Sequence, residues 1–433
     1  MSAGVRFEPA GPLRGKVTAP PDKSVSHRAA LLAAMSAEPV GIHNYLDSAD
    51  TNATLRVLRS LGVVVESRPD ELLVRGTGLR NPAEVTGALD VGNAGTLMRL
   101  LPGWLAAQPG GMWRIDGDDS IRRRPVDRIA EPLERMGARI EARDGRFAPF
   151  TVVGASLRGL DYELPVASAQ VKSCVLIAGL TAEQRTTVRE PAPSRDHTER
   201  LLARAGVPVS RAEGAVTISG VDELELDDVE VPGDLSSAAF LLVAGVLVRG
   251  SRVTVRGAGV NWTRTGLLRI LARMGGTLEG ELEAPGARSE LEPTADLTAV
   301  AGPLGGTVVE PEEVPLAIDE LPLLALLGCF ADGVTEVRGA GELRVKESDR
   351  ISSVVEGLRA LGADIEATAD GFAVTGTGGL RGGRIESRGD HRLAMLGAVA
   401  GAASREGVEV VGMEAAAVSY PGFADDLARL ARR

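Results

Sequence analysis

Hydrophobic residues in this chain follow two helical patterns that alternate along the sequence. In the first, as at residues 171–180 and 240–248, apolar residues lie on every side, which predicts a helix buried on all faces. In the second, as at Leu58-Arg-Ser-Leu-Gly62, the helix is amphipathic and a glycine closes it in the left-handed conformation. The buried helices are expected to begin near Ser24, Thr96, Ser168, Ser236, Asp319 and His391.

The sequence motif at the end of the amphipathic helix recurs along the whole chain. Further copies end at Gly137, Gly206, Gly275 and Gly362, and a variant without glycine occupies residues 427–433. A β-rich stretch follows each glycine, as at residues 63–66. Each copy therefore combines one buried helix, one amphipathic helix and short strands, roughly βαβαββ, and repeats at this scale dictate the whole fold.

Six repeats of this kind predict an α/β protein of two similar lobes, each with three buried helices under a shell of sheets. Residues 19–22 and 231–234 are rich in proline and are interpreted as crossings between the lobes. One lobe then comprises residues 1–20 plus 234–433, and the other residues 21–233. A single extended solenoid is the alternative, but solenoid repeats usually span about 20–50 residues and these are longer.

Composition narrows the class of protein. Aromatic residues make up only 3% of the chain, so the cores must consist of Leu, Val, Ile and Ala. The net charge of −11 argues against a nucleic-acid partner or an anionic membrane surface. Cys174 and Cys329 have no metal-ligand spacing, the four histidines are scattered, and no apolar run reaches the length of a bilayer span or a signal sequence. We expect a cytoplasmic monomer without a metal ion.

Candidate chemistry lies at the starts of the buried helices. Gly92-Asn-Ala-Gly-Thr-Leu-Met-Arg99 offers exposed backbone N–H groups at a helix start and an arginine one turn later, which together suit a phosphate or carboxylate. At the first helix, Lys23, Ser24 and Arg28 are spaced to reach a single anion. A capped helix with solvated cations is the alternative interpretation of either segment.

Three more clusters have similar placement. One is the arginine run before Pro125, in which Arg124 stands out. Another offers hydrogen-bond donors for hydroxyls and a phosphate, at Ser168-Ala-Gln170 and Ser194-Arg-Asp-His197. The last cluster mixes acids and bases: Asp319, residues 343–350 and residues 390–392. A solvated face or a surface ion-pair network has the same composition. However, two anions ~5 Å apart repel by about 3 kcal/mol per charge pair at an effective dielectric of ~20, so a site for two anionic ligands needs several convergent cations. Such cations are available at Lys23, Arg28, Arg124, Lys346, Arg350 and Arg392.

In order along the chain, these motifs resemble the EPSP synthase family. The specific ones are Val345-Lys-Glu-Ser-Asp-Arg350 and Asp390-His-Arg392, supported by Asp22–Arg28, Gly92–Thr96, Arg124-Pro125 and Ser168–Gln170. The resemblance implies a two-lobed inside-out α/β barrel, with six βαβαββ repeats in two pseudo-threefold lobes and the active site in the cleft between them. It also implies transfer of the enolpyruvyl group of phosphoenolpyruvate to shikimate 3-phosphate, with release of phosphate and no cofactor.

The resemblance implies roles for individual residues. Shikimate 3-phosphate would contact Lys23, Ser24, Arg28, Ser168, Gln170, Ser194, Arg195, Asp319 and Lys346. Phosphoenolpyruvate would contact Lys23, Asn93, Gly95, Arg124, Gln170, Arg350 and Arg392. Asp319 is the candidate base for the 5-hydroxyl and Glu347 the candidate acid for the methylene carbon, with Lys23 as a rival proton carrier. Because a free Glu has a pKa of about 4.3, Glu347 needs an environment that raises it.

The chain departs from the family at a few positions. Val418-Ser-Tyr-Pro421 lacks the lysine that many members carry three residues before the proline, Ala169 replaces a serine and Leu100 a frequent proline. The bare backbone of Gly95 leaves room for a phosphonate inhibitor such as glyphosate, which the resemblance places at the phosphoenolpyruvate site.

Three rival functions remain. UDP-N-acetylglucosamine enolpyruvyl transferases usually carry a cysteine before their Arg-Pro pair, and residues 116–124 contain none. RNA 3′-terminal phosphate cyclases have related repeats, but the acidic charge and the lack of a nucleotide loop argue against that family. The third is a non-catalytic repeat scaffold whose cations are solvated.

Overall fold

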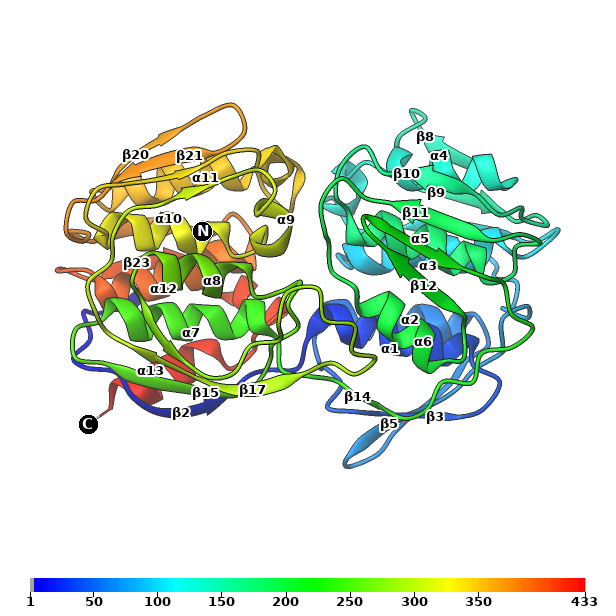
Figure 1. Ribbon diagram of the computed structural model, residues 1–433, viewed down its shortest axis with the longest axis horizontal. Coiled ribbons are helices and arrows are strands. Elements are labelled where there is room, and N and C mark those ends of the chain that lie inside the picture. The colour runs from blue at the N-terminus through cyan, green and yellow to red at the C-terminus, as the bar shows by residue number, and fades with distance from the viewer. Residues whose placement is uncertain (1–3, 433) are drawn as a thin grey trace. The chain divides into compact units, whose positions relative to one another are not determined.

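The chain divides into two compact units in a computed structural model that describes residues 4–432 (Figure 1). Unit 2 comprises Pro21–Pro232 and Arg288–Glu292, and unit 1 comprises the chain up to Pro20, Gly233–Ala287 and the chain from Pro293 onwards. Arg288–Glu292 was assigned to the other lobe from the sequence; that assignment is wrong, because these five residues pack with α6 of unit 2.

Unit 2 contains three four-stranded sheets of the same design. The second repeat shows it in full: β6 (Ala88–Asp90), α3 (Gly95–Ala106), β7 (Met112–Asp116), α4 (Asp127–Met136), β8 (Arg139–Arg143) and β9 (Phe147–Val153). Its strand order is β6-β7-β9-β8, with β6 parallel to β7 and the other pairs antiparallel. The third repeat has the same order in β10 (Asp161–Glu163), α5 (Ala169–Gly179), β11 (Thr186–Arg189), α6 (His197–Arg204), β12 (Val209–Ala212) and β13 (Ala215–Ile218).

The first repeat of unit 2 takes one strand from the far end of the unit. It consists of α1 (Lys23–Met35), β3 (Val40–His43), α2 (Ala49–Ser60), β4 (Val64–Ser67) and β5 (Glu71–Arg75). β14 (Val229–Glu230) completes its sheet by pairing in parallel with β3, so that Val229 lies opposite Ile42.

Unit 1 repeats the design with two strands from the N-terminal segment. The first repeat has α7 (Leu235–Leu247), β15 (Arg252–Gly259), α8 (Gly266–Arg273), β16 (Thr277–Glu279) and β17 (Thr294–Val300), and β2 (Arg14–Thr18) lies parallel to β15. The second has β18 (Val308–Val309), α9 (Val314–Ala317), α10 (Leu321–Phe330), β19 (Val334–Val337), the 3-10 turn η2 (Gly341–Val345), α11 (Arg350–Ala360), β20 (Asp364–Ala367) and β21 (Phe372–Thr375). The third has β22 (Gly383–Glu386), α12 (His391–Ala403), β23 (Val408–Val411), the 3-10 turn η3 (Met413–Val418) and α13 (Phe423–Ala431), and β1 (Val5–Phe7) pairs antiparallel with β23.

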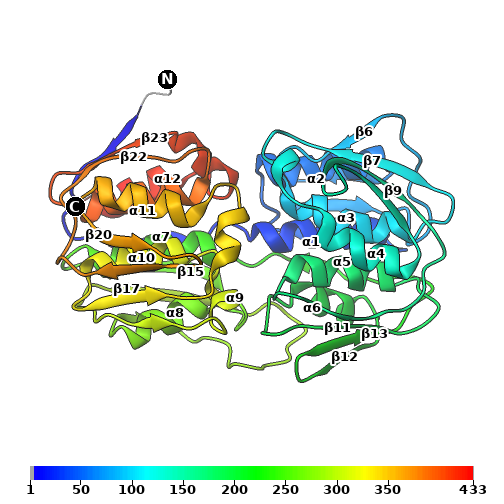
Figure 2. The same cartoon turned by 90° about the horizontal axis from the view of Figure 1, so that it is seen from above.

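The central helix of each repeat is the apolar one that the sequence predicts. α1, α3 and α5 in unit 2, and α7, α10 and α12 in unit 1, lie inside their sheets (Figures 1 and 2). All of α7 is buried except Leu247. With few aromatic side chains the helices approach closely: a Cβ on Gly103 of α3 would overlap the carbonyl oxygen of Cys174 in α5. The predicted inside-out α/β fold is confirmed, and an extended solenoid is excluded.

Glycines end the amphipathic helices as expected. Gly62, Gly137, Gly206, Gly275 and Gly362 follow α2, α4, α6, α8 and α11, and their φ angles of +90°, +119°, +79°, +88° and +95° lie in the left-handed region. There a side chain would be strained, so each glycine stops its helix and directs the chain into the next strand. Four central helices are capped by side chains, from Asp22, Ser168, Asp234 and Asp390, whereas α3 and α10 have no side-chain cap.

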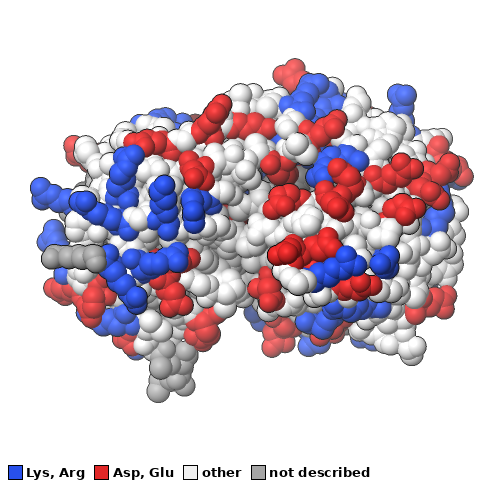
Figure 3. All heavy atoms as spheres, turned by 90° about the horizontal axis from the view of Figure 1, so that it is seen from below, with Lys and Arg blue, Asp and Glu red and all other residues white. Residues whose placement is uncertain are grey.

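The surface carries both signs of charge. Figure 3 shows Lys and Arg side chains alongside Asp and Glu side chains on one face. Many form exposed pairs, such as Arg252 with Glu279, which contribute little stability. No helix among residues 4–432 is long and apolar enough to cross a membrane.

Candidate active site

The start of α1 carries two cations, one in an ion pair and one hydrogen-bonded to hydroxyl groups. Nζ of Lys23 lies 3.1 Å from Oδ2 of Asp50, a buried carboxylate in the first turn of α2. Arg28 is 3% exposed and donates from Nε to the Thr198 hydroxyl (2.8 Å) and from Nη2 to the Ser173 hydroxyl (3.1 Å). The guanidinium is therefore held between α1, α5 and α6, and is not a solvated cation.

His27, which lies between these cations in the sequence, is part of the packed core. Its Nδ1 lies 2.7 Å from the Thr54 hydroxyl in the core. The pKa of His27 is lowered to about 4, mainly by burial; Asp50 opposes this shift, and the neighbouring Lys23 and Arg28 add to it. The imidazole is therefore neutral near pH 7 and adds no charge to the cluster.

The arginine run before Pro125 divides into exposed and buried members. Arg122 and Arg123 are exposed, and Arg122 pairs with Asp116. Arg124 is buried, and its Nη2 donates to Asn93 Oδ1 and to the Ser120 hydroxyl, both at 3.3 Å. The structure thus brings the predicted residues Asn93 and Arg124 together. Gly95 lies against the same guanidinium, because a Cβ there would overlap Nη1 of Arg124.

Gln170 joins this group to the start of α5. Its Oε1 accepts a hydrogen bond from Arg99 Nη1 (3.0 Å), and its Nε2 donates to the Thr96 hydroxyl (3.1 Å). Arg99 also donates to the Gly95 carbonyl oxygen at 3.5 Å. Arg99, expected from the sequence to contact a ligand, therefore orients the side-chain amide of Gln170.

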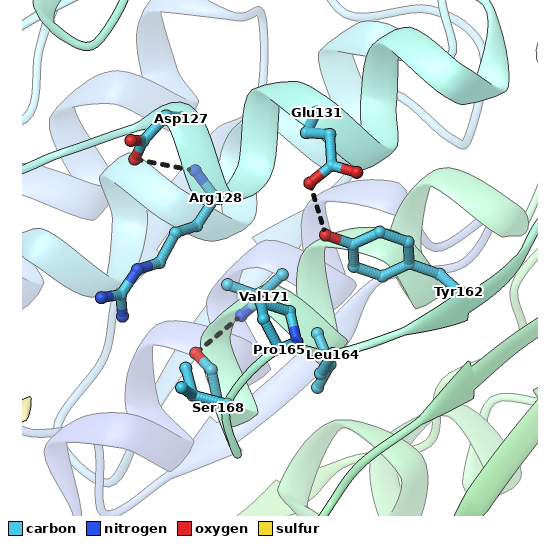
Figure 4. A pocket seen from close by; sticks show the side chains of 9 residues that line it. Asp127, Arg128, Glu131, Tyr162, Leu164, Pro165, Ser168 and Val171 are labelled. Carbon is cyan, nitrogen blue, oxygen red and sulfur yellow. Dashed lines mark hydrogen bonds between the residues drawn. The ribbon is translucent and has the colours of Figure 1, made fainter.

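Ser168 and Ser194 are both engaged within unit 2. Ser168 Oγ caps α5 by accepting from the Val171 N–H at 3.4 Å. Ser168 also lines a cavity of about 220 Å³ between α4 and β10, with Arg128, Glu131 and Tyr162 on its walls (Figure 4). Ser194 donates its hydroxyl hydrogen to Glu190 at 2.5 Å, and Arg195, the next residue, is partly exposed.

Unit 1 contains one arginine surrounded by acids. Arg350 is 1% exposed, and three carboxylates lie within 3.2 Å of its guanidinium. Nε lies 2.9 Å from Asp390, Nη1 lies 3.2 Å from Asp319, and Nη2 lies 2.7 Å from Glu347. Burial lowers the pKa of Arg350, but the three carboxylates outweigh it and raise the pKa above its ordinary value. For Asp390, burial is the largest single influence and raises the pKa, but the charge and hydrogen bond of Arg350, together with His391, outweigh it, so the net shift is downward.

Asp319 connects this group to Arg392. Oδ2 of Asp319 lies 3.5 Å from Arg392 Nη2, while Oδ1 faces Arg350. Arg392 Nη1 also lies 3.7 Å from Glu320, which accepts a hydrogen bond from Ser236 at the start of α7. The predicted residues Asp319, Glu347, Arg350 and Arg392 are thus in one cluster. Lys346 precedes Glu347 and is partly exposed.

Several partners of these residues were not expected from the sequence. Asp50, Glu320, Ser173 and Thr198 hold predicted site residues, and Asp390 was noticed only as part of a motif. Asp50 and Asp390 do carry one signal, since each is an acid at the start of a helix. That position also suits ordinary capping, so it does not by itself identify a site residue.

Two groups of three βαβαββ repeats, each with an apolar central helix inside its sheet, make up the fold that this chain shares with the enolpyruvyl transferases. The enolpyruvyl transferase NikO from Streptomyces tendae has this fold, with a TM-score of 0.78 and 20% identity over 99% of this chain and 97% of that one. The structure of EPSP synthase from Acinetobacter baumannii matches with a TM-score of 0.85 and 39% identity, over 98% of this chain and 97% of the other.

Sequence comparisons agree with this. The family model of EPSP synthase (3-phosphoshikimate 1-carboxyvinyltransferase) matches residues 7–427. A 3-phosphoshikimate 1-carboxyvinyltransferase of Thermus thermophilus is 48% identical over 98% of each chain. That of Bacillus subtilis strain 168 is 44% identical over 97% of this chain and 98% of its own. The chain therefore belongs to the EPSP synthase family, as its motifs indicate, and the assignment to the UDP-N-acetylglucosamine enzymes is not favoured.

Proposed function

We propose that this chain transfers the enolpyruvyl group of phosphoenolpyruvate to the 5-hydroxyl of shikimate 3-phosphate and releases phosphate, in the shikimate pathway of aromatic amino acid biosynthesis. The observation that carries the proposal is the placement of Asp319 between Arg350 and Arg392, with Glu347 on the same Arg350. A candidate base and a candidate acid therefore share one group of cations.

Shikimate 3-phosphate would be held mainly by unit 2. Lys23, Ser24 and Arg28 would bind its phosphate at the start of α1, with Arg195 adding a further cation. Ser168, Gln170 and Ser194 would face the rest of the molecule, with Asp319 and Lys346 contributed by unit 1. What supports this assignment is the geometry of Arg28, whose guanidinium donates hydrogen bonds to the hydroxyls of Thr198 and Ser173 beside the start of α1.

Phosphoenolpyruvate would be held by cations of both units. Arg124, with Asn93 and Gly95, would bind on one side, and Arg350 and Arg392 on the other. Lys23 and Gln170 would lie between the two ligands. Arginine suits this task because its planar guanidinium binds carboxylate and phosphate oxygens in a bidentate manner. Closure of the two lobes over the first substrate would bring these groups together.

The chemistry is an addition followed by an elimination. Asp319 accepts the proton of the 5-hydroxyl as the oxygen attacks C2 of phosphoenolpyruvate, and Glu347 donates a proton to C3. Phosphate then leaves C2 and takes up the proton held by Asp319, while one proton of C3 returns to Glu347, which restores the double bond and both carboxyl groups. Lys23 is the alternative proton carrier. Bringing two substrates together in this way supplies roughly 7–11 kcal/mol of the barrier. The protein acts as a monomer, with no cofactor and no nucleic-acid partner.

Phosphate release on mixing the purified chain with both substrates tests the proposal. UDP-N-acetylglucosamine in place of shikimate 3-phosphate is the control acceptor and should give no phosphate. Asp319→Ala and Glu347→Ala should each abolish turnover and retain measurable binding of shikimate 3-phosphate. No phosphate release by the wild-type chain would refute the proposal and favour a non-catalytic scaffold.

A further inference from the structure

A buried lysine in unit 2 takes no part in the mechanism above. Lys172 lies in α5, two residues after Gln170, and its side chain is 1% exposed. Its Nζ lies 2.7 Å from Glu199, 2.9 Å from Glu190 and 3.4 Å from the carbonyl oxygen of Ser194. Lys172, Glu190 and Glu199 are called the Lys172 cluster below.

The Lys172 cluster joins three elements of one repeat. Lys172 comes from α5, Glu190 follows β11 directly, and Glu199 lies in the first turn of α6. The segment between Glu190 and α6 carries Ser194 and Arg195, which are predicted to bind shikimate 3-phosphate. Both ends of this segment are therefore fixed to the same ammonium group.

Glu190 also holds the segment in its middle. Its Oε2 accepts the hydroxyl hydrogen of Ser194 at 2.5 Å, and its Oε1 accepts the Ser194 N–H at 3.4 Å. Pro191 and Pro193 have no backbone N–H group, so the segment forms fewer backbone hydrogen bonds. Hydrogen bonds to side chains, such as those of Glu190, are therefore more important for its position. The position of Ser194, and with it the backbone of Arg195, therefore depends on the carboxylate of Glu190.

The same contact between α5 and α6 also holds Arg28. Ser173 and Thr198, the sequence neighbours of Lys172 and Glu199, lie 2.7 Å apart through their hydroxyls, and both accept hydrogen bonds from Arg28. Two consecutive pairs thus fasten α6 to α5, one ionic and one between hydroxyls. A shift of α6 would move the acceptors of Arg28 as well as the segment before the helix.

The charges of the cluster fit a positioning role. Burial lowers the pKa of Lys172, but Glu199 and Glu190 reverse this effect and raise it, so the ammonium stays charged. Burial raises the pKa of Glu199 against the opposing effect of Lys172. A buried ion pair is weak evidence for stability, because the cost of desolvation offsets the attraction between the charges. The contribution of this one is therefore sought in the positions of the groups that it connects.

We propose that Lys172, Glu190 and Glu199 are positioning residues for shikimate 3-phosphate: the cluster sets the Ser194–Arg195 segment, and the α5–α6 contact sets Arg28, in the arrangement that receives the phosphate. The inference rests on the proposed function, because it concerns the same substrate. The residues do not touch the ligand and act through Ser194, Arg195 and Arg28.

Glu190→Gln provides the main test. The amide has the same shape but lacks the charge that binds Lys172 and the second acceptor that holds Ser194. We expect the Kd and the KM for shikimate 3-phosphate to rise by about tenfold or more, equivalent to about 1.4 kcal/mol. The KM for phosphoenolpyruvate and kcat at saturating shikimate 3-phosphate should change much less, because Arg124, Arg350 and Arg392 are untouched. Glu190→Asp keeps the charge and should recover part of the affinity.

Two control variants separate positioning from loss of charge or stability. Asp161→Asn removes a carboxylate from the sheet of Glu190, where it forms an exposed pair with Arg189. Val152→Ala opens a cavity in the core beneath β9 of the second repeat, outside α5 and α6, and should lower the melting temperature. Both should retain the wild-type Kd for shikimate 3-phosphate. If Glu190→Gln does not fold, Glu199→Gln replaces it in the test, with the same expected loss of affinity.

The outcomes distinguish this inference from the proposed function. If the wild-type chain turns over and Glu190→Gln binds shikimate 3-phosphate with unchanged affinity, the positioning role is overturned and the proposed function stands. Equal losses of affinity for both substrates would also overturn it, since they indicate general damage to the fold. A wild-type chain that neither binds shikimate 3-phosphate nor releases phosphate refutes the proposed function and this inference with it.

Discussion

Gly95 and Arg124 are in such close contact that glycine is the only residue that fits at position 95 without moving the guanidinium: a Cβ there would overlap Nη1 of Arg124. We predict that Gly95→Ala displaces Arg124 from Asn93 and Ser120 and raises the KM for phosphoenolpyruvate by about tenfold, or about 1.4 kcal/mol. Inhibition by glyphosate should weaken more than binding of shikimate 3-phosphate does. Steady-state kinetics with each substrate, and inhibition constants for both forms, check this.

A matched glycine provides the control for that substitution. Gly11 has no atom within 4 Å of the position of a Cβ, so Gly11→Ala should leave all constants at wild-type values. Equal inhibition constants for wild type and Gly95→Ala would contradict the prediction.

Asp50 is predicted to orient Lys23. Its Oδ2 lies 3.1 Å from Nζ, and both side chains are largely buried. Asp50→Asn should leave Lys23 without its ionic partner, lower kcat/KM by about tenfold or more, and reduce stability by a few kcal/mol, as expected when one member of a buried pair is removed. Asp47→Asn removes an exposed carboxylate from the loop just before α2 and should be close to wild type. Similar losses in both variants would show that the negative charge near the start of α2, and not the contact with Lys23, matters.

Asp390 should contribute stability that disappears in acid. Its pKa in the folded chain lies below the ordinary value of 3.8, because Arg350 overcomes the effect of burial. The stabilisation is therefore fully present above the unfolded pKa of about 3.9 and is lost as the pH falls through the lower folded pKa. Asp390→Asn should be less stable than wild type near neutral pH, with a smaller decline towards about pH 3. Denaturant unfolding at several pH values measures this, and curves that stay parallel for the two proteins would contradict it.

His27 should make stability decline at a higher pH. Its folded pKa of about 4 lies below the unfolded value of 6.5, so the unfolded chain binds a proton first as the pH falls. The stabilisation is complete above about pH 6.5 and diminishes between about pH 6.5 and pH 4. His27→Gln keeps a group that bonds to Thr54 and does not titrate, so its melting temperature should fall less over this interval. An identical fall in both proteins would assign the effect to other groups.

Much of the fold is predictable because its signals are local. The apolar helices and the glycines that end the amphipathic ones depend on short segments, and both are where the sequence places them. The site residues at helix starts are visible for the same reason. The sequence singles out Arg124 from the arginine run because a proline follows it directly and restricts its backbone. In the structure Arg124 is the buried member of the run, beside Asn93.

The remainder depends on contacts between distant segments. Glu347 lies three residues before Arg350, but nothing local indicates that Arg350 also contacts Asp319 and Asp390, or that Lys172 of α5 contacts Glu199 of α6. The position of Arg288–Glu292 is non-local in the same way, because His197 binds Glu292 and Arg200 binds the Leu291 carbonyl oxygen. Short polar side chains pair with whatever the tertiary fold brings near, so their partners emerge only from the three-dimensional structure.

The pairing of β1 and β2 with strands far along the chain determines the order in which the sheets can form during synthesis. β1 and β2 leave the ribosome before unit 2, yet β2 pairs with β15 and β1 pairs with β23, which emerge hundreds of residues later. Unit 2 is interposed between them: its three sheets are complete once β14 has emerged, and Arg288–Glu292 joins it later. The nascent N-terminal segment must therefore wait as an unpaired edge while a whole neighbouring unit matures, and its charged residues Arg14 and Lys16 are suited to keep such an edge from premature association.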